Sequence, residues 1–463
     1  MNRLRLFLLV LLLVSVGMAR AAAAELSGGA RSVDGDVVNP AGQEAGSGEA
    51  DPATPRSSQN LLFLPVTQYL AGEVRGPRMA RVSVDSSGRQ ANGTSTGMDM
   101  TPDGRFVVFF SGATNLVLGD TNGVADVFVH DRLTGQTTRV SVSSDGAQGN
   151  DNSFGGKISP NGRFVAFTSS ATSLVAGDTN TYQDVFVHDR QTGQTSMISR
   201  AADGASSNDH SGWADISADG RYVVFHSHAS NLVPDDENEK KGVFLHDRQT
   251  QQTRLISNSP WDGAFIWGEM PSISFDGRFI TFSSGSSIIY LYDRHLSEAR
   301  VVAHEHLGWN YALVTPYNPA ISGDGNFIIY ETRVHPDGGP GDDFYVWYRY
   351  DRQADVTWNI NGTLYPNTPS SSYPFAISPE GRYLAWDDPP LLADLSTGES
   401  AEVSINLDGE GASGKSVAVS AGGRIVLFNS EAAGLIVNDT NGVQDVFVRD
   451  MVTPDTAGEK AQP

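Results

Sequence analysis

The sequence predicts an all-β fold: a seven-bladed β-propeller of four-stranded antiparallel blades, with the ring closed by an N-terminal strand. A block of alternating apolar residues recurs seven times, which is the mark of a repeat architecture. Each block carries tight-turn dipeptides, and the chain contains 49 glycines in 463 residues. The last repeat lacks its fourth strand, and a segment that matches this strand precedes the first repeat.

The first half of each repeat predicts a hairpin of two strands, A and B. In residues 158–167, which read ISPNGRFVAF, the dipeptide Asn161-Gly162 is followed by alternating apolar residues. Asn, Asp and Gly accept the positive φ angles of a two-residue hairpin turn at low cost. The same pattern begins at Met100, Ile158, Ile216, Ile273, Ile321, Ile377 and Val419.

The second half predicts strands C and D. Residues 126–131 read DVFVHD, a Thr-Gly turn follows, and residues 139–142 read RVSV. The last repeat ends after strand C at residues 446–449, whereas residues 81–84 repeat the RVSV sequence ahead of the first strand A. We therefore expect residues 81–84 to pair beside residues 446–449, which closes the ring and covers both exposed edges.

The chain begins with a predicted signal peptide. Arg3 and Arg5 precede an apolar run, and small residues follow it. No other segment is long and apolar enough to span a membrane. From the signal peptide we expect export to the periplasm, the cell surface or the medium. The predicted divisions are a signal peptide at 1–24, a flexible low-complexity linker at 25–79, the propeller at 80–451 and a disordered tail at 452–463.

Charge and composition limit the possible partners. The formal net charge is −22, which disfavours nucleic acid and anionic lipid. The chain has no cysteine, so packing, ring closure or bound ions must stabilise it. We expect a monomer whose partner is a protein or a glycan.

The repeats resemble the TolB-type, WD-like propeller family. The resemblance is carried by residues 159–167 (SPNGRFVAF) and 184–193 (DVFVHDRQTG), and it covers roughly residues 80–451. It is strong in repeats 1, 2, 3 and 7 and weaker in repeats 4 to 6. The resemblance implies the fold. It leaves activity open, because such propellers include scaffolds, peptidase-attached domains and a few polysaccharide lyases.

The segment between strands B and C is a candidate calcium site in three repeats. Oxygen-bearing side chains at its positions 1, 3 and 7 can wrap a hard cation such as Ca²⁺. The same residues also suit turn chemistry, since Asn-Gly makes a turn and the last Asp can accept N–H groups. Both interpretations stay open for Asp120, Asn122 and Asp126, for Asp178, Asn180 and Asp184, and for Asp439, Asn441 and Asp445.

The B–C and D–A connections must emerge on one face of an up-and-down propeller. That face gathers the Asp- and Asn-rich loops, and it is the predicted interaction surface, because loops on a rigid scaffold often carry binding. The alternative is that these loops only keep the protein soluble.

Two sets of histidines are possible ligands. His130, His188 and His246 occupy one equivalent position in three repeats, so a ring holds them apart, and a packing or hydrogen-bonding role is expected. His304 and His306, with His210 on another D–A loop, are the one set from which a metal-assisted lyase or hydrolase centre could be assembled. No catalytic residue is assigned, and the favoured function is a non-enzymatic binding or scaffold propeller.

Overall fold

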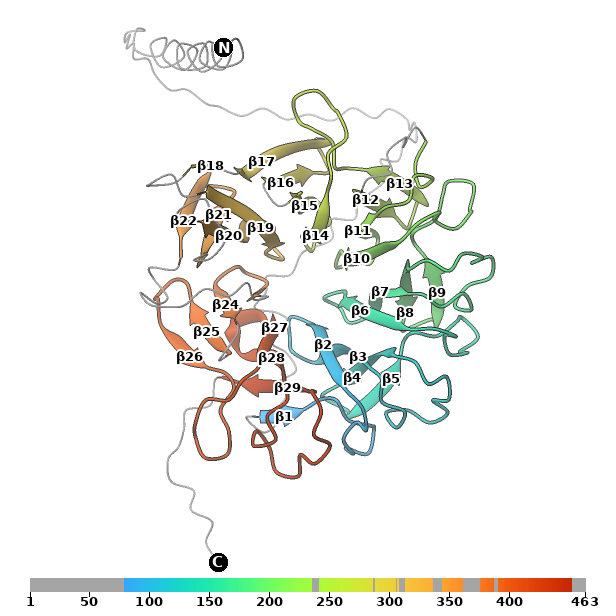
Figure 1. Ribbon diagram of the computed structural model, residues 1–463, viewed down its shortest axis with the longest axis vertical. Helices are drawn as coiled ribbons and strands as arrows, with labels where there is room; N and C mark the ends of the chain where they lie inside the picture. Colours follow the sequence, from blue (N-terminus) through green and yellow to red (C-terminus); the bar gives the residue numbers. More distant parts are fainter. Residues whose placement is uncertain are drawn as a thin grey trace, which may run out of the picture. The chain divides into compact units, whose positions relative to one another are not determined.

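The computed structural model describes residues 79–451, apart from 235–240, 286–287, 305, 308–312, 336–343, 361–374 and 387–389. Within this part of the chain the strands form seven separate sheets around a central channel (Figure 1). This confirms the predicted seven-bladed propeller. The predicted signal peptide and tail, and the predicted linker except Met79, lie outside the described residues. The described residues include no helix long and apolar enough to cross a membrane.

The first four blades each have four strands, ordered from the channel outward. Blade 1 contains β2 (Ser95–Met100), β3 (Phe106–Ser111), β4 (Asp126–Asp131) and β5 (Gln136–Arg139). Blade 2 contains β6 (Ser153–Ile158), β7 (Phe164–Ser169), β8 (Asp184–Asp189) and β9 (Gln194–Met197). Blade 3 contains β10 (Ser211–Ile216), β11 (Tyr222–Ser227), β12 (Gly242–Asp247) and β13 (Gln252–Leu255), and blade 4 contains β14 (Glu269–Ile273), β15 (Phe279–Ser284), β16 (Ile288–Asp293) and β17 (Glu298–His304).

The last three blades depart from this pattern. Blade 5 has an additional short strand and contains β18 (His306–Leu307), β19 (Leu313–Ile321), β20 (Phe327–His335), β21 (Phe344–Asp351) and β22 (Val356–Asn359). Blade 6 has short strands: β23 (Ala376–Ile377), β24 (Tyr383–Trp386), β25 (Leu391–Asp394) and β26 (Ser400–Glu402). Blade 7 joins both ends of the ring and contains β27 (Lys415–Val419), β28 (Ile425–Ser430), β29 (Asp445–Asp450) and β1 (Met79–Arg81).

Strand D lies earlier in the sequence than predicted. It covers Gln136–Arg139 in blade 1, so the RVSV sequence begins at its last residue. The reason is the serine of that sequence: the Ser141 hydroxyl donates to Asp126 (2.6 Å) and accepts the N–H of Val127 (3.1 Å). A side chain thus replaces the backbone ladder where the strand was expected to continue.

The N-terminal strand closes the ring as predicted, with the same shift. Antiparallel β1 pairs with β29, Met79 opposite Arg449 and Arg81 opposite Phe447. The Val82 N–H then donates to the Val446 carbonyl at 2.8 Å. Ser83 repeats the serine contact of blade 1, donating to Asp445 at 2.6 Å.

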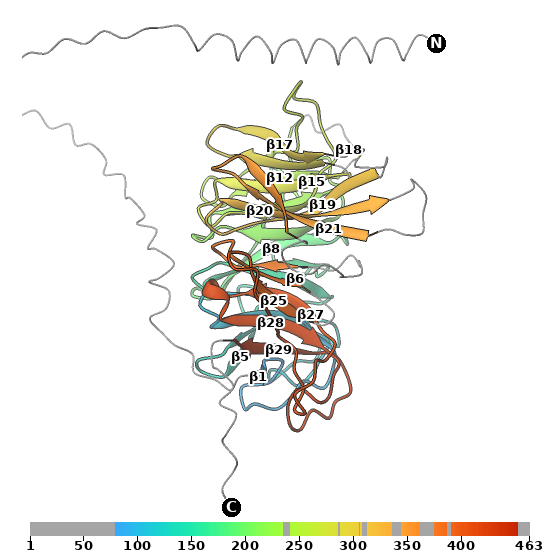
Figure 2. The same cartoon turned by 90° about the vertical axis from the view of Figure 1, so that its left-hand side faces the viewer.

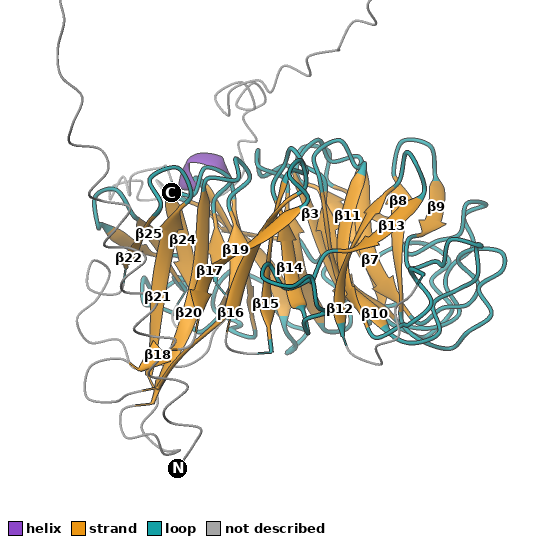
Figure 3. Ribbon diagram, turned by 90° about the horizontal axis from the view of Figure 1, so that it is seen from above, coloured by secondary structure: helices purple, strands orange, loops and turns teal. Residues whose placement is uncertain are grey.

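The apolar core lies between neighbouring blades rather than in one central mass. One cluster joins Val108 and Val129 of blade 1 to Val165 and Phe167 of blade 2, and others repeat this arrangement around the ring. Figure 2 shows the blades edge on, and Figure 3 shows the strands running between two loop-covered faces. Each blade therefore depends on its neighbours for burial.

An aromatic ring held between two arginines joins neighbouring blades on the face of the A–B and C–D turns. Phe106 of blade 1 has Arg105 at 4.5 Å on one side and Arg190 of blade 2 at 4.3 Å from its ring centre. Such cation–π contacts are stabilising when partly desolvated. Phe164, Tyr222 and Phe279 are held in the same way by arginines of their own blade and of the next.

The glycine of each A–B turn is required by this packing as well as by its backbone angle. Gly162 has φ of 73°, and a Cβ there would lie 2.4 Å from the ring of Phe106. Any side chain would force the two blades apart. The same clash with the preceding blade recurs at Gly104, Gly220, Gly277, Gly325, Gly381 and Gly423.

The aspartate that ends strand C has a partner that the sequence did not indicate. Asp131 accepts two hydrogen bonds from Arg105, at 2.9 and 2.8 Å, and one from the N–H of Leu133 in the C–D turn. Hydrogen bonds from Arg221 likewise hold the pKa of Asp247 at about 2.

Ring closure depends on Arg81, so its replacement tests the fold. Arg81→Met leaves the buried carboxylates of Asp439 and Asp445 without their shared guanidinium, 3.0 and 3.2 Å away. Loss of one member of a buried ion pair costs about 3–5 kcal/mol, which denaturant unfolding with a chelator present should detect. Arg89→Met is the control, because this arginine is 75% exposed and its pair with Asp85 is worth at most about 1 kcal/mol. Equal effects of the two substitutions would contradict the role of Arg81.

Candidate functional site

The predicted B–C loops are tied down by their asparagines. Asn122 donates one amide N–H to Asp126 (3.0 Å) and another to the Gly149 carbonyl on the D–A loop (3.0 Å). We call this pair of hydrogen bonds an asparagine clasp. Equivalent clasps run from Asn180 to Asp184 and Ser207, and from Asn441 to Asp445 and Ala91. The three asparagines thus link the two kinds of loop on this face into one frame.

A guanidinium group lies between the two aspartates in blades 1 and 7. Arg139 Nη1 is 3.2 Å from Asp120 and 2.9 Å from Asp126. Arg81 makes the same bridge between Asp439 and Asp445. A cationic group of the protein therefore stands where the calcium hypothesis places an ion in these blades.

Blade 2 keeps the aspartates and lacks this arginine, because Met197 ends its strand D. Burial, together with the charge of Asp184, raises the pKa of Asp178 to about 6. Burial also raises the pKa of Asp184. The three loops that look alike in sequence therefore differ in their electrostatics.

The histidines of strand C are structural, as predicted. His130, His188 and His246 each hydrogen-bond through Nδ1 to a threonine of strand D, at 2.9 Å. Burial lowers the pKa of His130 and of His246 to about 4, so both are neutral. They lie in three separate blades.

The set His210, His304 and His306 is spread over different elements. His210 accepts the N–H of Gln183 through Nδ1 (3.1 Å) and packs its ring edgewise on Tyr182. His304 ends the outer strand of blade 4, and His306 belongs to the added strand of blade 5. Glu305 and the side chain of His306 lie outside the described residues. In the described ranges no three His, Asp or Glu side chains are grouped so that they could hold a metal ion.

The blades differ from one another at the mouth of the central channel. Strand A contains a β-bulge near the face of the B–C and D–A loops, and in four consecutive blades it holds a residue with positive φ. For a bulky side chain such a conformation is an outlier, and outliers of this kind gather at functional sites. The four residues are Gly155, Trp213, Met270 and Asn318.

The strand B residue opposite each bulge also changes from blade to blade. Its neighbours repeat closely, since the residue before it is aromatic in each blade. The position itself holds Phe110, Thr168, His226, Ser283, Glu331 and Asn429 in the six blades where it is described. This position is polar in five of the six blades and varies within an otherwise repeated core, which marks the channel mouth as the specialised part of the ring.

Blade 3 gathers aromatic and titratable groups at this mouth. The exposed indole of Trp213 lies 6.3 Å from the ring of His226, whose buried Nδ1 has no hydrogen-bond partner. Burial lowers the pKa of His226 to about 3, helped by Lys241 and His228. Lys241 pairs with Glu269 of blade 4 at 3.2 Å. The wall of the mouth is thus rich in aromatic and hydrogen-bonding groups.

Blade 5 places a fully buried acid at the equivalent position. Glu331 accepts a hydrogen bond from the Asn318 amide (3.4 Å). Burial raises the pKa of Glu331 to about 7, although hydrogen bonds from Asn318, Tyr317 and Trp347 act in the opposite direction. This group therefore changes charge near neutral pH.

Glu331 gives a pH-dependent stability that can be tested. Because its folded pKa lies above the ordinary value of 4.5, its contribution is fully present below pH 4.5 and is lost as the pH rises through 7. Glu331→Gln mimics the protonated acid, so it should stabilise the fold at pH 8.5, by up to about 3 kcal/mol, and have little effect at pH 4.5. Denaturant unfolding at the two pH values measures this, with the exposed Glu298→Gln as control. An effect that does not change with pH would contradict the assignment.

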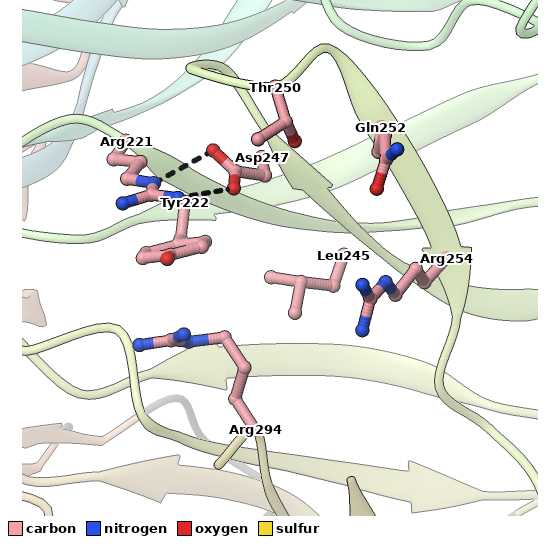
Figure 4. A pocket seen from close by; sticks show the side chains of 8 residues that line it. All are labelled: Arg221, Tyr222, Leu245, Asp247, Thr250, Gln252, Arg254 and Arg294. Atoms are coloured by element: carbon pink, nitrogen blue, oxygen red, sulfur yellow. Dashed lines mark hydrogen bonds and ion pairs between the residues drawn. The ribbon is translucent and has the colours of Figure 1, made fainter.

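A recess of about 300 Å³ lies between blades 3 and 4 on the opposite face (Figure 4). Arg221 is neutralised there by Asp247, as the dashed lines show. Arg294 stacks on Tyr222 and donates to the Gly277 carbonyl, and the Arg254 guanidinium has no partner among the described residues. The recess can therefore accept an anionic group.

Comparison with solved structures supports the fold. An oligogalacturonate lyase in complex with manganese has a TM-score of 0.53 at 13% identity, over 80% of this chain and 92% of that one. The oligogalacturonate lyase of Vibrio parahaemolyticus has a TM-score of 0.52 at 14% identity, over 82% and 94%. A putative TolB of Agrobacterium tumefaciens has a TM-score of 0.37 at 13% identity, over 58% and 80%, which is too low to carry an argument. At these identities the likeness extends to the fold alone.

No protein-family model and no curated protein matches the sequence. The function must therefore be argued from the site. In the described ranges the grouped ligands that a manganese centre needs are not present, because no three His, Asp or Glu side chains converge.

Proposed function

We propose that this chain is an exported, monomeric, non-enzymatic binding propeller of the TolB type, which holds a neutral glycan over its B–C and D–A loops. The observation that carries the proposal is that four exposed aromatic side chains belong to the loops and the innermost strand of the consecutive blades 2 to 4. Trp213 is 65% exposed, Trp261 is 75% exposed and Trp267 is 49% exposed. Tyr182, on the B–C loop of blade 2, is 39% exposed.

These side chains stand on a rigid frame. The Asn180 clasp ties the loop that carries Tyr182 to the following D–A loop, and Trp213 belongs to the innermost strand of blade 3. Large, rigid aromatic side chains give contact area at low cost in conformational entropy. A pyranose ring offers C–H groups to such a face and hydroxyl groups to the polar loops between the aromatic residues.

The charge of the protein favours a neutral ligand. With a formal net charge of −22 the chain repels polyanions at long range. The oxygen-rich loops instead attract cations, and calcium bound among them would stiffen the frame. Export through the signal peptide at residues 1–24 is consistent with a glycan of the envelope or the medium.

Binding can be tested with a panel of soluble β-glucan, mannan and arabinogalactan, with polygalacturonate as the acidic comparison. Trp213→Asn removes the indole and keeps a residue that tolerates positive φ, and Trp261→Ala removes a second ring. Each should weaken binding of the neutral glycan about tenfold in calorimetry, as expected when an aromatic anchor is lost.

Trp358→Ala is the matched control for these variants. Trp358 is 43% exposed but lies on the outer strand of blade 5, so the substitution should leave affinity unchanged. Equal affinity of all three variants would contradict the proposed surface. Capture of a protein, with no glycan bound, would favour a protein partner instead.

A metal-assisted lyase is the second candidate, favoured by the shared fold with the two oligogalacturonate lyases. It predicts that oligogalacturonate and manganese yield an unsaturated product, which absorbs in the ultraviolet. We expect no such product, because no three ligands converge in the described ranges and the chain is acidic. Turnover above that of the heat-denatured protein would overturn the binding proposal.

A further inference from the structure

Three equivalent B–C loops allow a comparison within one molecule. Blades 7, 1 and 2 share the first aspartate, the asparagine clasp and the last aspartate of this loop. Any difference in their chemistry must therefore come from residues outside the motif. The decisive residue is the last one of strand D.

In blades 1 and 7 that residue supplies a cation to buried carboxylates. The Asp120 side chain is 1% exposed and Asp126 is fully buried, so water compensates neither charge. Arg139 lies between Asp120 Oδ1 and Asp126 Oδ2, and Arg81 lies between the same two atoms of Asp439 and Asp445. Two independent copies thus place a positive charge at one point.

Blade 2 has an apolar residue at that place. Met197 is buried in the apolar cluster between blades 1 and 2 and offers no charge. The oxygen that faces the guanidinium in both sister sites is Oδ1 of the first aspartate. Both Asp120 Oδ1 and Asp178 Oδ1 are buried and accept no hydrogen bond, but Asp120 Oδ1 has the Arg139 guanidinium at 3.2 Å, whereas Asp178 Oδ1 has no ion pair among the described residues.

The second aspartate of blade 2 accepts three side-chain hydrogen bonds, as its counterpart in blade 1 does, because Ser207 donates to Oδ1; what it lacks is the arginine. Asp184 Oδ2 accepts only the Asn180 amide at 2.9 Å, whereas its counterpart in blade 1 also accepts from arginine. The nearest arginine does not replace the missing group. Arg200 directs Nε and Nη2 to the Gly204 carbonyl, at 3.0 and 2.5 Å, and forms no ion pair with Asp178 among the described contacts.

We infer that blade 2 binds a hard metal cation, with Ca²⁺ as the physiological candidate, between Asp178 Oδ1 and Asp184 Oδ2. The ion takes the place that guanidinium groups occupy in blades 1 and 7. The donors are oxygens, which hard cations prefer, and water completes a coordination shell of six to eight. The proposed function includes calcium bound among the loops, and this inference names the blade that binds it. It does not depend on glycan binding.

The full exported chain should bind one Ca²⁺ in calorimetry, and its melting temperature should rise by about 3 °C at 100-fold saturation compared with chelator at matched ionic strength. Met197→Arg supplies the guanidinium of the sister blades. It should abolish the calcium-dependent rise and raise the melting temperature in chelator. If this variant fails to fold, Asp178→Asn should abolish the calcium effect on its own.

Arg139→Met is the converse experiment, because it turns blade 1 into a copy of blade 2. It should lower the melting temperature in chelator and bind a second Ca²⁺, which restores much of the loss. An equal calcium-dependent rise in wild type and Met197→Arg would overturn the blade 2 site. Identical melting of the wild type with Ca²⁺ and with chelator would overturn it as well. Glycan affinity measured in chelator tests the proposed function separately from this inference.

Discussion

At four blade interfaces the aromatic ring at the start of strand B lies between an arginine of its own blade and one of the next, and this contact joins the neighbouring blades. Phe106, for example, is covered by Arg105 and Arg190, and Gly162 of the following turn rests against its edge. Because a Cβ cannot fit there, the turn of one blade can lie directly against the ring of the preceding blade. The contact occupies one face of the ring with structural groups. The opposite face carries the B–C and D–A loops.

Much of this fold was readable from the sequence, since alternation, turn dipeptides and the displaced RVSV segment predict the strands and the closure. The end of strand D was misplaced because a serine side chain takes over the hydrogen bonding of the backbone. The Arg105–Asp131 pair was not anticipated, because the two residues are 26 positions apart and meet only once strands B and C are in register. Periodicity reveals strands, but it does not identify which polar side chains lie opposite each other.

The candidate site was predicted only in part. The loop face follows from topology alone, and the alternative of a lyase or hydrolase also pointed to the channel mouth, but the residues that set this mouth apart were missed. Trp213 and His226 lie on one hairpin of blade 3 and Glu331 lies on blade 5, and none of the three belongs to a motif. Their signal was present as variation at one strand B position among otherwise similar repeats. In a repeat protein the shared positions describe packing, and the position that changes points to what one blade does differently.

The pairing of β1 with β29 has a consequence for how the molecule is made. Arg81 is among the first described residues, yet its partners Asp439 and Asp445 are more than 350 positions later. During synthesis the ring must stay open until almost all of the chain up to β29 has been made. Blades 1 to 6 can assemble in order on the way, but the final join has a large loop-closure entropy to overcome. A product that stops short of β29 would expose two unprotected sheet edges, so translation arrest is more hazardous for this protein than for a fold with local contacts.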